Sequence, residues 1–522
     1  MLSQIKALCR RTGSQLALAF IAGASTALAF APYSIWAIYP IALAFALWHS
    51  RQLSPKASFY YWLSFGFGSF AIGISWVHVS MSRFGGLPLV ASIGLMALLA
   101  FYLALYPALA GYVSQKLNNK LPTSLCSLSW RNLVIFPAAW TLSEWMRGWV
   151  LTGFPWIWAG YSQTEGPLAP LASVIGALGL SFVIALIAGA LALLLERSSP
   201  KSWLAAALAL PLLTLTTYIA PKLSPVTPTG ESVNVVLVQG NIAQSMKWQP
   251  EALWPTMLKY MDLSRPKFDA DIIIWPEAAI PAPVEMVHDF LDNANRAANL
   301  NDSAIVTGII SHIDGTFYNS LIVLGNHNQA QQQSADYTVN GNNEFKKHHL
   351  LPIGEFVPFE SLLRPLAPFF NLPMSSFGRG DYQQANLSAL GHKLAPAICF
   401  EIAFPEQLRA NVYHDTDLLL TVSNDAWFGE SNGPLQHMEI AQMRAIELGK
   451  PLLRGTNNGV TGIVDPTGKI TDSLPQFETG VLSATVPLYQ GETLFYQWGQ
   501  TPILSLSGLL LAIALIRRKR VR

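Results

Sequence analysis

Residues 272–277 read Ile-Ile-Ile-Trp-Pro-Glu, and residues 394–399 read Leu-Ala-Pro-Ala-Ile-Cys. Each stretch is a short apolar run that ends at one reactive side chain, Glu277 in the first and Cys399 in the second. Such runs are typical of buried strands in a parallel sheet, and side chains at the carboxyl ends of these strands meet in a crevice. The two stretches therefore predict an α/β sheet with a chemically active edge.

Similar runs continue this pattern over the second half of the chain. They are separated by turn or helical segments and lie at 233–239, 304–310, 319–325 and 417–423. We therefore expect an α/β domain over residues 221–500. The stretch 326–345 is rich in Asn and Gln and has no periodicity, so we expect a loop or hairpin there.

The whole chain is too apolar for an ordinary soluble enzyme. Of its 522 residues, 51% are hydrophobic and only 12% are charged, against about 25% charged in a typical soluble domain. The formal net charge is +2, and Lys and Arg form short clusters between apolar runs, which argues against a nucleic-acid-binding surface. The composition predicts a membrane protein.

Apolar stretches long enough to cross a bilayer, about 20 residues each, flank the polar half of the chain. We expect about eight transmembrane helices, at 12–31, 36–49, 57–78, 88–114, 132–150, 168–195, 202–220 and 501–516. This pattern divides the chain into a helical domain at 1–220, the α/β domain at 221–500, and a last helix with a basic tail at 501–522.

Basic residues collect between alternate pairs of these helices, and basic loops are retained on the cytoplasmic side of a membrane. The clusters comprise Lys6, Arg10, Arg11, Arg51, Lys56, Lys116, Lys120, Arg131, Arg197, Lys201 and the tail 517–522. With both termini inside, the α/β domain lies on the outer face of an inner membrane, which is the periplasm in a bacterium with two membranes. A cleaved signal peptide ending near Ala29 is the alternative for the N-terminus.

Two charges interrupt the fifth apolar stretch. Glu144 and Arg147 are three residues apart, so they can pair on one helix face, and charge within a membrane-spanning helix often marks a functional site. The alternative is that both side chains reach a membrane interface. The aromatic stretch 153–158 that follows predicts either an interfacial anchor or a broken helix.

The cysteines and one lysine narrow the chemistry. Cys9, Cys126 and Cys399 are odd in number and lack CxxC or Cys/His spacing, so neither a disulfide framework nor a zinc site is expected.

Lys347 precedes a further apolar run. If Glu277, Lys347 and Cys399 converge, the carboxylate can take the thiol proton and the ammonium can stabilise an oxyanion, as acyl transfer requires. Taken singly, each has an ordinary explanation as a core cysteine, a helix-start glutamate or a solvated lysine.

Two other sets of polar residues suggest different chemistry. His348 and His349 are candidate metal ligands, but no third ligand has suitable spacing, so we expect no metal. Ser423, Asp425 and His437 could form a hydrolase triad, but no nucleophile-elbow glycines surround the serine. We therefore assign these three residues to structure or to substrate positioning.

Three motifs resemble the signatures of the nitrilase, or carbon–nitrogen hydrolase, superfamily. They are Trp275-Pro276-Glu277, Lys347-His348-His349-Leu350 with Pro352, Gly354 and Glu355, and Cys399-Phe400-Glu401. Further stretches are similar to the apolipoprotein N-acyltransferase family, at 144–147, 153–156, 238–241, 423–429, 436–437 and 454–459. The resemblance covers nearly the whole chain and implies an α-helical membrane bundle joined to a nitrilase-like αββα sandwich.

The resemblance also implies an activity. Enzymes of this family take a fatty acyl chain from a phospholipid, hold it as a cysteine thioester, and pass it to the α-amino group of the diacylglyceryl-cysteine that begins an apolipoprotein. The implied partners are therefore membrane lipid, a phospholipid donor and an apolipoprotein acceptor. No cofactor and no nucleic acid is implied.

Site roles follow by motif from the same resemblance. Glu277 becomes the general base, Lys347 the oxyanion stabiliser and Cys399 the nucleophile, and Glu355 and Glu401 become supporting carboxylates. The implied substrate contacts are Trp248, Phe400, Asn424, Trp427 and Phe428. A tyrosine is common after the cysteine in this family, so Phe400 departs from the pattern and any hydrogen bond from that hydroxyl is absent here.

The apolar segment 356–377 bears on the choice between functions. We expect it to dip into the membrane and admit acyl chains, and the alternative is a core-packing insertion. A membrane-anchored nitrilase-type amidohydrolase would use the same three residues, with water resolving the acyl-enzyme, but would not need this segment. A catalytically idle lipoprotein-binding or transport protein would need none of the three residues.

Overall fold

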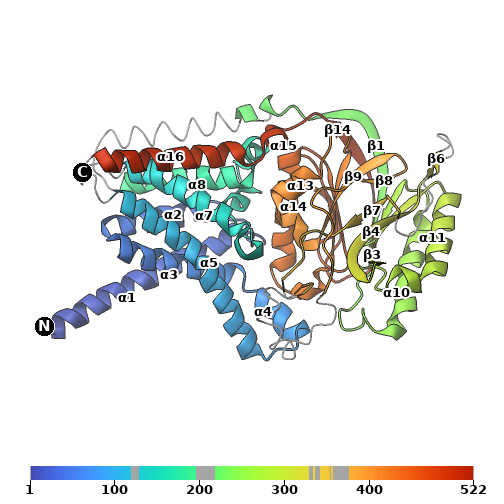
Figure 1. The fold of residues 1–522 in the computed structure, drawn as a ribbon, viewed down its shortest axis with the longest axis horizontal. Helices are drawn as coiled ribbons and strands as arrows, with labels where there is room; N and C mark the ends of the chain where they lie inside the picture. Colours follow the sequence, from blue (N-terminus) through green and yellow to red (C-terminus); the bar gives the residue numbers. More distant parts are fainter. Residues whose placement is uncertain are drawn as a thin grey trace. The chain divides into compact units, whose positions relative to one another are not determined.

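The computed structural model describes residues 2–118, 129–195, 218–220, 222–328, 333–334, 341–352, 354–356 and 376–520 (Figure 1). Contacts between residues divide the chain into two compact units. A helical unit comprises Met1–His78, Pro88–Ser224 and Leu494–Arg522, and an α/β unit comprises Val79–Leu87 and Pro225–Thr493.

Apolar helices build the helical unit. The main ones are α1 (Leu2–Ser25), α2 (Ile38–His49), α3 (Pro55–Gly73), α5 (Leu89–Asn118), α7 (Phe136–Arg147), α8 (Ala172–Leu195) and α16 (Thr501–Arg520). Among the described residues, three stretches are long and apolar enough to cross a membrane: Thr12–Ala29, Leu89–Asn118 and Ala169–Leu195. A fourth is present if α3 and the segment Val77–Phe84, bent by 56°, form one span.

The predicted number of about eight transmembrane helices is not reached in the described part of the chain. The expected spans at 36–49, 132–150 and 501–516 correspond to shorter helices, namely α2, α7 and the apolar part of α16. Most of the expected span at 202–220 lies outside the described residues. Length and composition therefore support three or four spans within the described ranges.

Glycines let the helices of this unit pack closely. A Cβ placed on Gly23 in α1 would lie 1.8 Å from the carbonyl oxygen of Phe65 in α3. A Cβ on Gly111 in α5 would lie 2.0 Å from Cδ1 of Trp62, also in α3. Close backbone approach at small residues stabilises helix pairs in lipid, where the hydrophobic effect does not drive them together. Helix α3 is thus packed tightly between α1 and α5.

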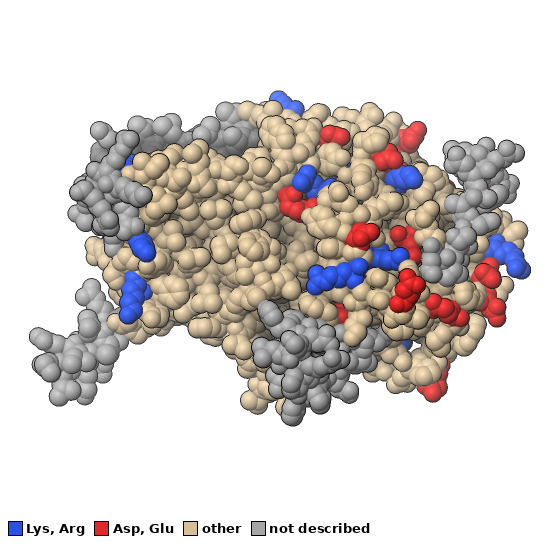
Figure 2. Space-filling model, in the orientation of Figure 1, with Lys and Arg blue, Asp and Glu red and all other residues tan. Residues whose placement is uncertain are grey.

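The surface of the helical unit suits a hydrocarbon environment. Large apolar side chains are exposed on it, among them Ile21, Ile41, Val90, Leu98 and Leu509. In the view of Figure 2, Asp and Glu side chains gather over the α/β unit, whereas the visible described surface of the helical unit is almost uncharged. Extended apolar surface of this kind marks a region that contacts membrane rather than water.

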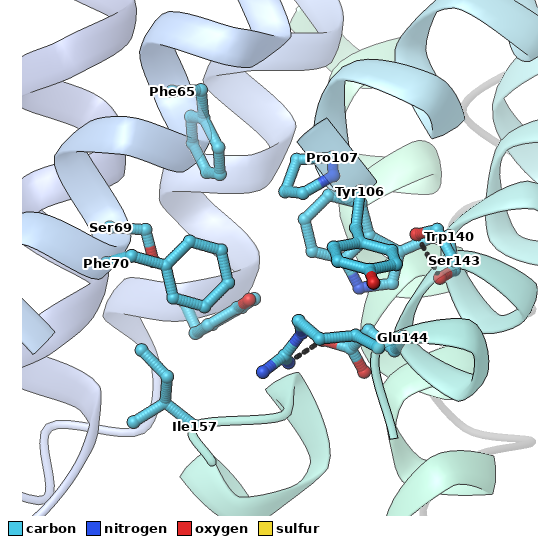
Figure 3. Close-up of a pocket in the computed structure, with 11 residues that line it drawn as sticks. Phe65, Ser69, Phe70, Tyr106, Pro107, Trp140, Ser143, Glu144 and Ile157 are labelled. Atoms are coloured by element: carbon cyan, nitrogen blue, oxygen red, sulfur yellow. Dashed lines mark hydrogen bonds and ion pairs between the residues drawn. The ribbon is translucent and has the colours of Figure 1, made fainter. Parts of the chain in front are cut away.

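Glu144 and Arg147 are buried inside the helical unit. The Arg147 guanidinium donates to the carbonyl oxygens of Phe154 (2.9 Å) and Trp156 (2.6 Å), and Glu144 accepts a hydrogen bond from the backbone N–H of Ala159 (3.0 Å). The two side chains approach to 3.8 Å and help to line a cavity within the unit (Figure 3). They therefore satisfy the backbone of a non-helical segment between α7 and α8.

This arrangement decides two alternatives that the sequence left open. The interface reading of Glu144 and Arg147 is wrong, because both side chains are buried. The stretch 153–158 is not an exposed interfacial anchor, because Trp156 and Trp158 are buried in the unit; it is a non-helical segment between the 3₁₀ turns Val150–Thr152 and Ala159–Gln163.

Two six-stranded sheets form the α/β unit, with the orders β14–β1–β2–β3–β4–β7 and β13–β12–β11–β10–β9–β8. The first contains β1 (Thr227–Gln239), β2 (Ile272–Ile274), β3 (Ala304–Ile313), β4 (Thr316–Gly325), β7 (Glu344–Lys346) and β14 (Gly480–Gln490). The second contains β8 (Leu387–Ala389), β9 (His392–Ile398), β10 (Leu418–Ser423), β11 (Leu452–Thr456), β12 (Gly462–Val464) and β13 (Ile470–Ser473). All the predicted strands are present, and the Asn- and Gln-rich stretch also holds a small hairpin of β5 (His327–Asn328) and β6 (Gln333–Ser334).

The central strands of each sheet are parallel. In the first sheet, β2 pairs in parallel with both β1 and β3, so that Ile272 lies opposite Val235 and Ala304. In the second sheet, β10 pairs in parallel with both β9 and β11, so that Leu419 lies opposite Ala395 and Leu452. The chain segments that leave neighbouring parallel strands therefore emerge at one edge of each sheet.

Alternation of side chains along the strands creates two cores. Val235 and Ile274 of the first sheet pack with Leu420 and Leu453 of the second, so the two sheets face each other. The neighbouring Val236 faces the opposite way, toward α10 (Pro250–Ser264) and α11 (His288–Leu300), which cover the outer face of the first sheet (Figure 1). Helices α13 (Pro405–Ala410) and α14 (Gly433–Leu448) lie beside the second sheet. The expected αββα sandwich is confirmed.

Candidate active site

The predicted reactive residues follow the ends of strands. Strand β2 stops at Ile274 and the chain continues through Trp275 and Pro276 to Glu277, and β9 stops at Ile398, directly before Cys399. Proline has no N–H for a strand ladder, so it ends the pairing of β2 there. Lys347 follows β7 in the same way. Each reactive side chain thus lies at the carboxyl end of a strand.

Lys347 lies between two carboxylates. Its Nζ is 2.8 Å from Glu355 Oε2 and 3.5 Å from Glu277 Oε1, and its side chain is buried. The Nδ2 of Asn319 donates to Oε1 of both glutamates, at 2.9 Å each. Asn319 was missed from the sequence, where a single amide in the apolar strand β4 gives no sign that it faces the reactive groups. These contacts fix Glu277, Lys347 and Glu355 relative to one another.

The surroundings keep Glu277 and Lys347 charged. Burial alone would raise the pKa of Glu277, but the charge of Lys347 and the hydrogen bond from Asn319 outweigh it and hold the pKa below its usual range. Burial alone would lower the pKa of Lys347, but Glu355 and Glu277 together raise it above its usual range. The site therefore presents an ionised carboxylate beside a permanent ammonium.

Cys399 is half-buried and has a backbone φ of 54°, in the left-handed region that side chains rarely adopt. Burial raises the pKa of its thiol, the charge of Glu277 raises it further, and the charge of Lys347 opposes both. The thiol is therefore protonated at neutral pH. It becomes a nucleophile only when a base removes its proton.

Glu401 connects Lys347 to the cysteine segment. Its Oε1 accepts the backbone N–H groups of His348 (2.8 Å) and His349 (3.0 Å), and its Oε2 accepts the N–H of Ile398 (2.9 Å). The glutamate therefore joins the residue before Cys399 to the residues after Lys347. In the described ranges, no group of three His, Cys, Asp or Glu side chains is placed to hold a metal ion.

The residues predicted to contact substrate occupy different environments. Trp248 and Trp427 expose 40% and 41% of their surface and can meet a ligand, and Phe428 is half-buried. Phe400 is buried against Phe404, with ring centroids 5.0 Å apart.

Asn424 is also buried, and its contacts hold the site together. Its backbone N–H donates to Glu277 Oε2 at 2.9 Å, and its Nδ2 donates to Gln244 at 2.7 Å. Its Oδ1 accepts a hydrogen bond from Asn457 at 3.0 Å. Asn424 is therefore tied to the carboxylate of Glu277 rather than open to solvent.

A second buried lysine lies beside Glu277. Lys247 is 2% exposed, and its Nζ donates to the carbonyl oxygen of Glu277 at 3.0 Å. Burial lowers its pKa to about 8, opposed by the charges of Glu277 and Cys399. Sequence reasoning singled out only its neighbour Trp248, because a lysine in a polar segment usually lies in solvent.

The apolar segment 356–377 lies almost wholly outside the described residues. Only its two ends are described. The backbone N–H of Phe377 donates to the carbonyl oxygen of Glu355 at 3.1 Å, and the guanidinium of Arg379 lies over the ring of Phe356, 4.9 Å from its centroid. The expected role of the segment in admitting acyl chains stays a prediction.

The charges of a carboxylate and an ammonium both affect the protonated thiol of Cys399, and all three groups lie at strand ends of the αββα sandwich. This is the arrangement of a cysteine-dependent acyl-transfer site. Residues 234–494 match the carbon–nitrogen hydrolase family, and residues 22–190 match the N-terminal domain of apolipoprotein N-acyltransferase.

Relatives match over their full length. The chain is 70% identical to the apolipoprotein N-acyltransferase of Shewanella oneidensis, over 524 residues and 100% of both chains. It is 49% identical to that of Vibrio vulnificus, over 98% of this chain and 99% of the other. It is 48% identical to that of Vibrio cholerae, over 99% of each chain. The chain belongs to the apolipoprotein N-acyltransferase family. It is a membrane acyltransferase with a carbon–nitrogen hydrolase domain.

Proposed function

We propose that this acyltransferase moves a fatty acyl chain from a phospholipid to the α-amino group of the N-terminal diacylglyceryl-cysteine of apolipoproteins, through a thioester on Cys399. The observation that carries the proposal is the position of Lys347, which pairs with Glu277 while its charge acts on the Cys399 thiol. The names of the full-length relatives supply the acceptor class.

In the first half-reaction, Glu277 takes the thiol proton and the Cys399 sulfur attacks the ester carbonyl carbon of the phospholipid. The carbonyl oxygen becomes an oxyanion, which the ammonium of Lys347 stabilises. When the oxyanion collapses, the carbon–oxygen ester bond breaks and the lysophospholipid alkoxide takes the proton from Glu277. The products are a thioester on Cys399 and a lysophospholipid.

In the second half-reaction, the neutral α-amino group of the apolipoprotein attacks the thioester carbonyl. Glu277 takes a proton from the attacking nitrogen, and Lys347 again faces the oxyanion. Collapse breaks the carbon–sulfur bond, and the thiolate recovers its proton from Glu277. Because the first product leaves before the acceptor reacts, the kinetics are ping-pong.

The other predicted residues receive roles consistent with their positions. Glu355 holds the ammonium of Lys347, and Glu401 holds the segments on either side of the site. The exposed indoles of Trp248 and Trp427 and the ring of Phe428 contact acyl chains or the acceptor. Phe400 and Asn424 are buried and support the site from within the α/β unit, Asn424 through its hydrogen bond to Glu277.

We place the catalytic domain, residues 221–500, in the periplasm, between a helical domain at 1–220 and a last helix at 501–522. The basic loops support this orientation, with about eight spans and both termini on the cytoplasmic side of the inner membrane. Acyl transfer from phospholipid fits that location, because the two half-reactions use neither a nucleotide nor a metal. Phospholipid, apolipoprotein and surrounding lipid are the partners, and nucleic acid is not.

Mass spectrometry of the full-length protein in phospholipid micelles tests the proposal. We expect the Cys399 peptide of the wild type to gain the mass of a fatty acyl group, which hydroxylamine removes and a diacylated lipopeptide with a free amine clears. The Cys399→Ala variant should gain nothing there, and Cys126→Ala should behave as wild type. No adduct, together with Cys399-dependent hydrolysis of small amides, would contradict the proposal and favour an amidohydrolase.

A further inference from the structure

A buried polar cluster lies directly behind Cys399. It consists of Ser423 at the end of β10, Asp425 in the 3₁₀ turn Asp425–Phe428, His437 in α14 and Arg454 in β11, and we call it the support cluster. All four side chains are at most 1% exposed. Buried polar groups are costly unless they are well paired, so a cluster of this kind beside a reactive thiol calls for an explanation.

The hydroxyl of Ser423 joins the cluster to the thiol. Its Oγ lies 2.6 Å from Asp425 Oδ1 and 3.4 Å from Cys399 Sγ. A serine has one hydroxyl proton, and an ionised carboxylate at 2.6 Å is the stronger acceptor. The proton of Ser423 therefore points to Asp425 while the thiol is protonated, and a lone pair of Oγ faces Sγ. Once the thiol loses its proton, the same hydroxyl can turn and donate to the thiolate.

His437 joins the cluster to the backbone of Cys399. Its Nε2 lies 3.0 Å from the Cys399 carbonyl oxygen, which can only accept, so Nε2 carries a hydrogen. Its Nδ1 lies 3.0 Å from the Arg454 guanidinium, which can only donate, and 3.2 Å from Asp425 Oδ1, which can only accept. Burial and then Arg454 lower the pKa of His437, which favours the neutral ring. In the neutral ring with a hydrogen on Nε2, the lone pair of Nδ1 accepts from Arg454, the nearer of the two partners.

Asp425 and Arg454 fix the other two members. Arg454 donates to Asp425 Oδ2 at 2.8 Å, and a Cβ on Gly459 would lie 2.1 Å from the same oxygen, so glycine there leaves room for the carboxylate. Burial alone would raise the pKa of Asp425, but the charge of Arg454, together with the hydrogen bond from Ser423, holds it well below its usual range. Asp425 is thus a fixed acceptor and not a base.

These contacts exclude a hydrolase triad. In such a triad the histidine accepts the proton of the serine hydroxyl, whereas here the hydroxyl of Ser423 bonds to Asp425 and His437 bonds to a backbone carbonyl. The intervening Asn424 donates its backbone N–H to Glu277. Three consecutive residues therefore have three different partners: Ser423 contacts the thiol, Asn424 contacts the carboxylate of Glu277, and Asp425 pairs with the guanidinium of Arg454.

We propose that Ser423 and His437, fixed by Asp425 and Arg454, are positioning residues for Cys399: Ser423 orients the thiol, and His437 holds the residue in its left-handed backbone conformation. The proposal rests on Cys399 being the nucleophile. It accounts for the φ of 54° at a residue that is not glycine, because the carbonyl of Cys399 accepts a hydrogen bond from Nε2 of a fully buried ring.

The test compares Ser423→Ala with Ser423→Thr, which keeps a hydroxyl, and His437→Leu with His437→Gln, which keeps a side-chain N–H donor. The readouts are the rate of acyl-enzyme formation, the KM for phospholipid, and the pH dependence of Cys399 alkylation by iodoacetamide. Ser303→Ala is the matched control, because Ser303 is a buried serine of the same unit that donates to the carbonyl of Ala270, away from the site.

We expect Ser423→Ala to slow acyl-enzyme formation about 10- to 100-fold with KM unchanged, because the thiol loses its orienting partner. Its alkylation midpoint should move to higher pH, because a hydrogen bond that stabilises the thiolate is lost. Ser423→Thr should recover most of the rate, and His437→Gln should keep more of it than His437→Leu.

Acylation within twofold of wild type in Ser423→Ala, or a change in KM alone, would overturn the proposal. Loss of folding in one alanine or leucine variant leaves the threonine and glutamine variants to decide. The alkylation readout needs no acyl donor. If Ser423→Ala shifts the alkylation profile and the wild type never forms an acyl-enzyme, the result would therefore support the positioning role while contradicting the proposed function.

Discussion

Lys247 provides a test of the electrostatics of the site. Its ammonium is buried and donates to the carbonyl oxygen of Glu277 at 3.0 Å, and burial lowers its pKa to about 8. Lysine is charged below its pKa and neutral above it, so Lys247 is about 90% charged at pH 7 and about 10% charged at pH 9. Its charge stabilises the negative charge that develops on Cys399. The support it gives is therefore present at pH 7 and lost as the pH rises through 8.

The size of the effect follows from the charge of Lys247, because its hydrogen bond to the Glu277 carbonyl is already present before the reaction. A charge strengthens a hydrogen bond by about 1–1.5 kcal/mol over a neutral one, and we take this as the gain when negative charge develops nearby. Lys247→Met, which keeps a long apolar side chain, should then slow acyl-enzyme formation about 5- to 13-fold at pH 7. Above pH 9 the wild-type lysine is neutral, and the ratio of wild type to variant should fall toward 1.

The assay is quenched-flow mass spectrometry of the Cys399 thioester between pH 6.5 and 9.5, for wild type and Lys247→Met side by side. Changes in other titrating groups cancel in the ratio of the two rates. Lys450→Met is the matched control, because Lys450 is also buried, also has a pKa lowered by burial, and donates to the carbonyl of Tyr489 at 3.2 Å. A ratio for Lys247→Met that stays constant across this range would refute the reasoning.

Two further changes test the packing of each unit. Gly308→Ala would place a Cβ 2.8 Å from Cα of Glu277, so we expect about 1–3 kcal/mol of lost stability and a slower enzyme. The measurements are the melting temperature and the rate of acylation, and both should fall. Gly480→Ala is the control and should change neither, because its Cβ meets only a side chain, at 3.4 Å. Arg147→Met should cost about 3–5 kcal/mol, because buried carbonyls and the Glu144 carboxylate lose their partner. Thermal unfolding in detergent should then rank the double variant with Glu144→Gln as more stable than Arg147→Met alone, and the reverse order would count against a structural pair.

The sequence was informative where local pattern determines position. Glu277 and Cys399 could be found because an apolar run stops at each of them, and parallel strands bring their ends together. Lys347 was found by motif, since β7 has three residues and is too short to give a periodic signal. The αββα architecture followed from the resemblance, and the two cores bear it out.

Contacts between distant segments could not be read from the same pattern. Asn319 and Glu277 are 42 residues apart in the sequence. They meet because β3 pairs with both β2 and β4, and the sequence pattern does not reveal the register of these pairs. Lys247 looked like a solvated lysine, and its burial depends on how the segment before α10 folds over Glu277. The transmembrane count is not confirmed in the described residues for a related reason: burial against neighbouring helices, not length alone, allows α7 to carry two charges.

Burial and the charges of the site together explain why the resting thiol is protonated. Glu277 and Glu355 carry two negative charges, and Lys347 and Lys247 carry two positive charges at neutral pH, so the four groups balance without help from a thiolate. In a cysteine–histidine pair, by contrast, the imidazolium stabilises a thiolate before substrate arrives. Here proton transfer from Cys399 to Glu277 would neutralise one of the two carboxylates beside Lys347, so that the ammonium, still held by Glu355, can stabilise new negative charge. That charge is best placed on the oxyanion of a bound ester, so the geometry couples activation of the thiol to the presence of the acyl donor.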